Sequence, residues 1–139
     1  MKTILTLIIL SPLISFAQIK IGASLSAGLS NKSAVGEMAI ATNYHNLYFY
    51  PISFKIHSKM SRPDMPVIIE SRAGYKLAFV EPYIGYGYHM AGQDNKPQYK
   101  QYTGLKPACG IILHRGRIIL TGSKSGEVYS VMVGIFGVN

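Results

Sequence analysis

The chain has no tryptophan, a single cysteine and few charged residues for its length. Charged residues occupy 14% of its 139 positions, whereas about a quarter is usual for a globular domain. One cysteine excludes a disulfide scaffold, and a hydrophobic fraction of 48% excludes an intrinsically disordered chain. The length allows one domain. The few charges are unbalanced, since 14 Lys and Arg stand against 6 Asp and Glu.

No apolar run is long enough for a membrane-spanning helix, which needs about 20 residues. The longest run covers residues 4–10 near the N-terminus, follows Lys2 and is ended by Pro12. Residues 15–17 then provide a small-x-small cleavage site. This order is typical of a secretory signal peptide. We therefore expect residues 1–17 to direct export through the Sec pathway and residues 18–139 to form one mature domain.

After Gln18 the dominant pattern is an alternation of apolar and other residues with a period of two. Ile19, Ile21 and Leu25, for example, share one side of an extended chain. The 14 glycines and 10 tyrosines also favour an all-β, turn-rich protein. We predict about eight strands, at 19–28, 37–45, 48–57, 67–76, 80–90, 104–114, 117–121 and 129–136.

The predicted connections alternate in length, as in an up-and-down antiparallel meander. They are tight near His45-Asn46, Leu77-Ala78 and Arg115-Gly116. The others are longer and more polar, and lie at 29–36, 58–66, 91–101 and 123–126.

The residues on the other side of each strand indicate which environment each side of the sheet faces. This side, opposite the apolar residues, consists mainly of Gly, Ala and Ser with isolated charges, which suits the cramped interior of an eight-stranded barrel. The long apolar side then suits lipid, because a closed barrel leaves no unpaired backbone in hydrocarbon. Tyrosines near both strand ends are typical of interfacial aromatic girdles; they are Tyr44, Tyr48, Tyr50, Tyr75, Tyr88, Tyr99, Tyr102 and Tyr129.

Four segments are typical of an exported membrane barrel: residues 15–18 at the cleavage site, the opening strand at 19–23, the tyrosine-rich segment at 80–88 and the closing strand at 129–137. On these the chain resembles the small eight-stranded outer-membrane β-barrel proteins of Gram-negative bacteria. The resemblance implies a porin-like monomer in the outer membrane, with membrane lipid, lipopolysaccharide and the barrel-assembly machinery as partners. Members commonly end on an aromatic residue, whereas here Phe136 is followed by three residues.

Charged residues on the predicted interior face point to a polar network in the lumen. Glu70 and Arg72 are two apart on one strand, Glu81 is on the next strand, and Lys106 is on the one after. Buried charges need partners, because taking them out of water is costly. We therefore predict that these four residues form a paired network that fills the lumen. An open pore is the alternative.

Six basic residues fall in the longer predicted connections, where only Asp64 and Asp94 oppose them. In an outer-membrane barrel these connections face outward, and lipopolysaccharide phosphates are natural counterions there. A soluble cationic rim is the alternative. The six are Lys32, Lys59, Arg62, Lys96, Lys100 and Lys124.

Catalytic and metal-binding patterns are weak. Some barrels of the family are lipid A deacylases or acyltransferases, and the deacylases pair a His with a Ser two residues later. Here Arg115 and Gly116 follow His114, which the alternation points inward. We predict no catalytic site, metal, cofactor or nucleic-acid partner. A membrane-embedded acyl hydrolase or transferase and a secreted barrel that binds a hydrophobic ligand remain the alternatives. The histidines, all expected to face inward, are His45, His57, His89 and His114.

Overall fold

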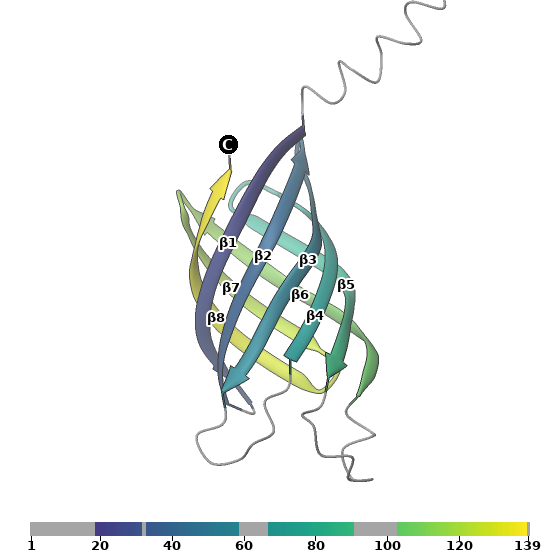
Figure 1. Cartoon of the computed structure of the whole chain (residues 1–139). Coiled ribbons are helices and arrows are strands. Elements are labelled where there is room, and N and C mark those ends of the chain that lie inside the picture. Colours follow the sequence, from purple (N-terminus) through teal and green to yellow (C-terminus); the bar gives the residue numbers. More distant parts are fainter. Residues whose placement is uncertain (1–18, 32, 59–66, 91–102, 139) are drawn as a thin grey trace, which may run out of the picture.

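The computed structural model is a closed antiparallel barrel of eight strands (Figure 1), described for residues 19–31, 33–58, 67–90 and 103–138. Each strand pairs with its neighbours in sequence, and β8 returns to pair with β1. The predicted all-β up-and-down barrel is confirmed. The predicted signal peptide lies outside the described residues. The strands are β1 (Ile19–Ser30), β2 (Ala34–Tyr44), β3 (Leu47–Ser58), β4 (Val67–Tyr75), β5 (Val80–Met90), β6 (Gly104–Arg115), β7 (Ile118–Ser125) and β8 (Val128–Val138).

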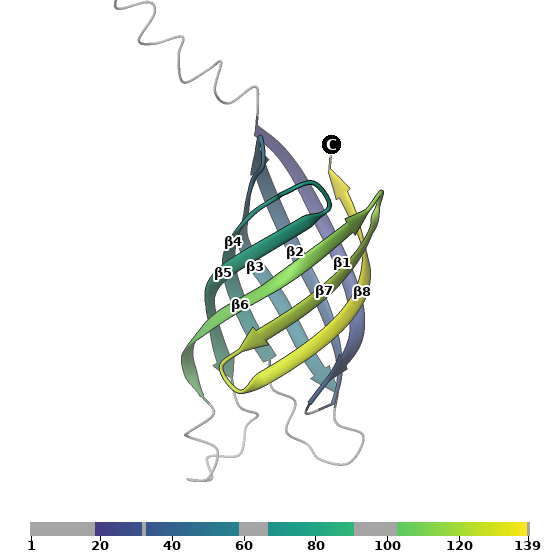
Figure 2. The same ribbon diagram turned by 180° about the vertical axis from the view of Figure 1, so that it is seen from behind.

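The two ends of the barrel differ (Figures 1 and 2). The turn end holds the start of β1, the end of β8 and the connections between β2 and β3, β4 and β5, and β6 and β7. Each of these three connections contains a residue with positive φ, as tight hairpin turns require. These residues are His45 at 54°, Ala78 at 56° and Gly116 at 63°. The other end, where β1, β3, β5 and β7 end, is called the loop end.

Two connections at the loop end are shorter than the sequence predicts. β1 continues to Ser30, and β7 continues to Ser125. A positive φ of 56° at Gly126 then lets the chain reverse tightly into β8. The predictions of longer connections at 29–36 and 123–126 are therefore wrong, and Lys124 lies on the outward face of β7 instead of in a loop.

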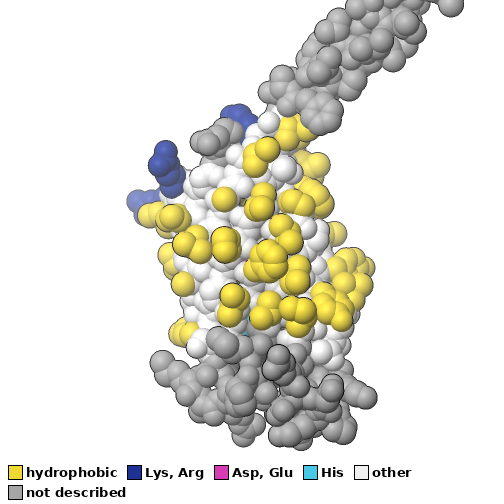
Figure 3. Space-filling model, viewed as in Figure 1, with side chains coloured by type: hydrophobic (Ala, Val, Ile, Leu, Met, Phe, Trp, Pro, Cys, Tyr) yellow, Lys and Arg dark blue, Asp and Glu magenta, His cyan; other side chains and the backbone are white. Residues whose placement is uncertain are grey.

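The barrel wall is apolar outside and polar inside. Ile84, Leu105 and Leu29 expose 73%, 67% and 71% of their surface, whereas Arg72 and Glu70 expose 2% and 1%. On the face shown in Figure 3, hydrophobic side chains cover the wall, and the visible Lys and Arg side chains gather at the turn end. A water-soluble domain has the opposite arrangement, because burying charges and exposing large apolar patches are both unfavourable. No helix in the described residues is long and apolar enough to cross a membrane.

A β-bulge in β3 changes which of its side chains face the lumen. Around Pro51 the register shifts against both neighbouring strands, so β3 contains one extra residue there. As a result Tyr48 and Tyr50 are buried in the lumen, and Phe49 faces outward. Strict alternation predicts the reverse for these three residues and is wrong on this half of β3.

Glycines on β5 make room for large charged side chains on β4. Gly85 is paired with Arg72, and Gly87 is paired with Glu70. A Cβ atom at Gly85 would collide with the backbone of Ser71 and Arg72, so the two strands approach closely at this point. Placing small residues opposite large ones lets side chains fill a narrow barrel. The lumen is therefore shaped around the charges on β4.

Candidate functional site in the barrel lumen

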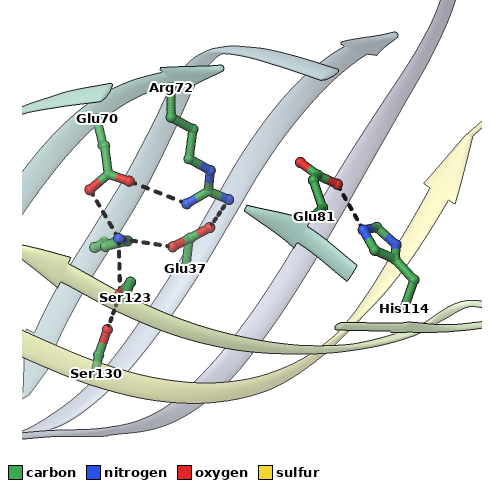
Figure 4. Close-up of polar contacts among 8 residues, drawn as sticks. Glu37, Glu70, Arg72, Glu81, His114, Ser123 and Ser130 are labelled. Carbon is green, nitrogen blue, oxygen red and sulfur yellow. Dashed lines mark hydrogen bonds and ion pairs between the residues drawn. The ribbon is translucent and has the colours of Figure 1, made fainter. Parts of the chain in front are cut away.

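Four charged side chains form a closed ring of ion pairs inside the lumen (Figure 4). Arg72 donates from Nη2 to Glu37 Oε1 at 2.6 Å and from Nη1 to Glu70 Oε1 at 3.3 Å. Lys55 Nζ lies 3.0 Å from Glu70 Oε2 and 3.4 Å from Glu37 Oε2. Each cation thus touches both carboxylates. The ring carries no net charge, and each of its side chains is at most 2% exposed.

Aromatic rings and hydroxyls surround this ring of ion pairs. The guanidinium carbon of Arg72 lies 4.5 Å from the centroid of the Tyr50 ring and 4.7 Å from that of the Tyr83 ring. The faces of both aromatic rings therefore attract the positive charge of Arg72. Lys55 Nζ also donates to Ser123 Oγ at 3.4 Å, and Ser123 Oγ lies 2.5 Å from Ser130 Oγ. The ion pairs therefore connect β2, β3 and β4 to β7 and β8 across the lumen.

A second polar pair lies at the turn end of the lumen. His114 Nε2 is 2.7 Å from Glu81 Oε2, and both residues are buried. The ring of His114 packs against those of Tyr48 and Phe136, with centroids 6.0 Å and 5.8 Å away. Tyr48 and Phe136 are themselves 6.0 Å apart. These three rings narrow the lumen at the turn end.

Two His–Ser pairs lie toward the loop end of the lumen. His89 Nε2 is 2.9 Å from Ser125 Oγ, and His57 Nδ1 is 3.2 Å from Ser30 Oγ. Three of the four histidines thus face the lumen. His45 does not, because it occupies the exposed turn between β2 and β3, so its predicted inward placement is wrong.

The structure brings together only part of the predicted lumen set. Glu70 and Arg72 contact each other, but their other partners are Glu37 and Lys55, which the predicted set omits. Glu81 pairs with His114 in the separate cluster at the turn end, as Figure 4 shows. Lys106 is half-buried on the lumen side of β6, near the loop end. Glu37 and Lys55 also lie at interior positions of the alternation, which is the signal that could have found them.

Of the six basic residues predicted to contact lipopolysaccharide, only Lys124 is among the described residues. It is exposed, and its Nζ lies 5.1 Å from the centroid of the Tyr129 ring on β8. The other five lie outside the described residues: Lys32, Lys59, Arg62, Lys96 and Lys100.

Comparisons with known proteins do not assign the chain to a family. A scan against protein-family models finds no match, and a search of curated proteins finds no relative. Among solved structures, the chain is similar to the crystal structure of Neisserial surface protein A. The TM-score is 0.44 and the identity is 10%, over 85% of this chain and 94% of that chain. The fold assignment rests on the strand pairing described above.

The polar groups of the described lumen contact one another in separate clusters. A nucleophilic site needs a hydroxyl or thiol, a base and an orienting acid in one chain of contacts. In the described lumen the His–Ser pairs lie toward one end, and the Glu81–His114 pair lies at the other. No group of three His, Cys, Asp or Glu residues in the described part of the chain could hold a metal ion.

Proposed function

We propose that this chain is a non-enzymatic integral outer-membrane β-barrel whose lumen is closed by its own side chains. In this proposal it contributes to envelope structure or to surface interaction through its loops. The observation that carries the proposal is the inverted distribution of polarity, with an apolar wall around a ring of buried ion pairs. A lipid bilayer is the environment in which such an apolar outer surface is stable.

Strand dimensions agree with a bilayer. A tilted strand crosses the hydrocarbon region with about 9–11 residues, and the strands here have 8 to 12. Closure between β1 and β8 satisfies the backbone groups that an open edge would expose to lipid. Short turns of outer-membrane barrels face the periplasm, so we assign the turn end to that side and the loop end to the cell surface.

Fractionation of cells that express the full chain tests the location. We expect the protein in the outer-membrane fraction, soluble only with detergent. We also expect faster gel migration before boiling than after it, because a closed barrel stays compact. Recovery in the periplasm or medium without detergent would instead support the soluble alternative that binds a hydrophobic ligand.

The purified barrel is expected to give no steady single-channel conductance in planar bilayers. Eight strands leave an interior just wide enough for side chains, and here charged and aromatic groups occupy it. A large porin recorded in the same bilayers is the positive control. Steady, reproducible conductance steps from this protein would contradict a closed lumen.

We further propose that the basic residues at the loop end bind lipopolysaccharide phosphates. Lys124 supports this, because it is exposed near the loop end of β7. Replacing Lys32, Lys59, Arg62, Lys96, Lys100 and Lys124 by Gln is expected to weaken lipopolysaccharide association at low salt, where such attraction is least screened. Unchanged retention of lipopolysaccharide by the folded variant would contradict this part of the proposal.

A further inference from the structure

The turn end contains an open cavity of about 350 Å³, to which the proposed function assigns no role. Tyr48, His114 and Phe136 line it, and their rings pack against one another. All three rings are at least 92% buried, so the base of the cavity is aromatic and firmly packed. The cavity has the size of a small-ligand site.

Two cations line the cavity from different hairpins. Lys76 follows β4, is half-buried, and places Nζ 5.9 Å from the centroid of the Tyr48 ring. Arg117 precedes β7 and is exposed. Their backbones are fixed to neighbouring elements, since Lys76 N donates to Asn46 O at 2.7 Å and Phe136 N donates to Arg117 O at 2.7 Å.

No acidic side chain is among the described residues that line this cavity. One of the lining residues, His114, contacts a buried carboxylate, with Nε2 2.7 Å from Glu81 Oε2. A cleft lined by charges of one sign concentrates the potential and attracts ions of the opposite sign. Arg and Lys are also the side chains that recognise phosphate, Arg through its planar fork and Lys as a point charge.

We propose that this turn-end cavity binds a phosphate group, with Lys76 and Arg117 as its counterions. The aromatic base leaves space for an apolar or uncharged part attached to the phosphate. Two sources share this chemistry: the headgroup of an anionic phospholipid in the adjacent leaflet, and a soluble phosphate. The inference goes beyond the proposed function, because it concerns the end of the barrel opposite the surface loops.

Binding can be measured on the full barrel in maltoside micelles, which contain no phosphate. The backbone amide signals of Gly116, His114 and Gly137 are followed by nuclear magnetic resonance in two titrations, one with inorganic phosphate and one with phosphatidylglycerol added to the micelles. We expect saturable shifts with phosphatidylglycerol. Saturation with inorganic phosphate as well would show that the phosphate alone is sufficient, whereas binding of the lipid alone would identify the headgroup as the source.

Matched double variants separate this site from general attraction to a basic surface. K76Q/R117Q removes the two cavity cations, and K20Q/R115Q removes two exposed cations at the same end that do not line the cavity. Loss of two charge-assisted hydrogen bonds is expected to weaken binding at least about tenfold in K76Q/R117Q, with less than about a twofold change in K20Q/R115Q. Heat-dependent gel migration verifies that both variants are folded. Equal weakening in both variants, or no saturable shift with either probe, would overturn the proposal.

Discussion

Replacing Arg72 by methionine is expected to destabilise the folded barrel by about 3–5 kcal/mol. Methionine fills much of the same volume but leaves Glu37 and Glu70 with Lys55 as their only cation in the ring. Two buried carboxylates, each at most 2% exposed, are then paired with one cation instead of two. The measurement is the free energy of unfolding in lipid vesicles, from reversible denaturant titration followed by circular dichroism.

Two further variants make this result specific to the ring of ion pairs. R115M removes an Arg from an exposed position at the turn end and is expected to change stability by less than about 0.5 kcal/mol. Adding E37Q to R72M restores charge balance, because a Lys55–Glu70 pair remains. The double variant should therefore recover at least about 1 kcal/mol relative to R72M. A cost for R72M no larger than that for R115M would show that the ring does not hold the barrel together.

An arginine placed at the centre of the outer wall is expected to cost about 2–4 kcal/mol in a bilayer. Val133 is suitable, because it is near the middle of β8, faces outward and is 59% exposed. V133R would place a guanidinium in hydrocarbon, whereas in water the same change would replace an exposed apolar side chain by a charged one. The same vesicle unfolding assay measures the difference.

The matched control uses depth within the wall. Ile118 also faces outward, at 56% exposure, but it begins β7 at the turn end beside Arg117. Because the penalty falls to about 0–1 kcal/mol near the interfaces, I118R should be tolerated. If V133R and I118R had equal and small effects, the wall would not be embedded in lipid as proposed.

The strand pattern could be predicted from the sequence because its cause is local. Successive side chains of a strand point to opposite sides, so a wall between two different environments imposes a period of two. Seven of the eight strands follow this rule without interruption. The exception is β3, where a proline follows Tyr50. A bulge depends on how neighbouring strands fit together, and nothing in the alternation marks where the extra residue is accommodated.

The same bulge explains why the partners in the lumen were not predicted. Counting back from the turn at His45-Asn46 without a bulge pairs Glu37 with Phe54. The extra residue moves the pairing by one position, so that Glu37 lies opposite Lys55. This single shift places a cation beside the carboxylate and allows the ring with Arg72 to close. The lumen residues could be recognised as interior from the sequence, but their partners depend on register.

Closure of the barrel has a consequence for how the protein folds. The first strand completes its hydrogen bonding only when the last strand arrives, since Ser24 is paired with Phe136 and Leu25 with Ile135. Contacts between residues so far apart in sequence form slowly. By contrast, Glu37, Lys55, Glu70 and Arg72 come from three consecutive hairpin-linked strands and can meet early. The ring of ion pairs can thus form before the barrel closes. Until β8 pairs with β1, the unpaired edge strands of the partly formed sheet remain prone to aggregation.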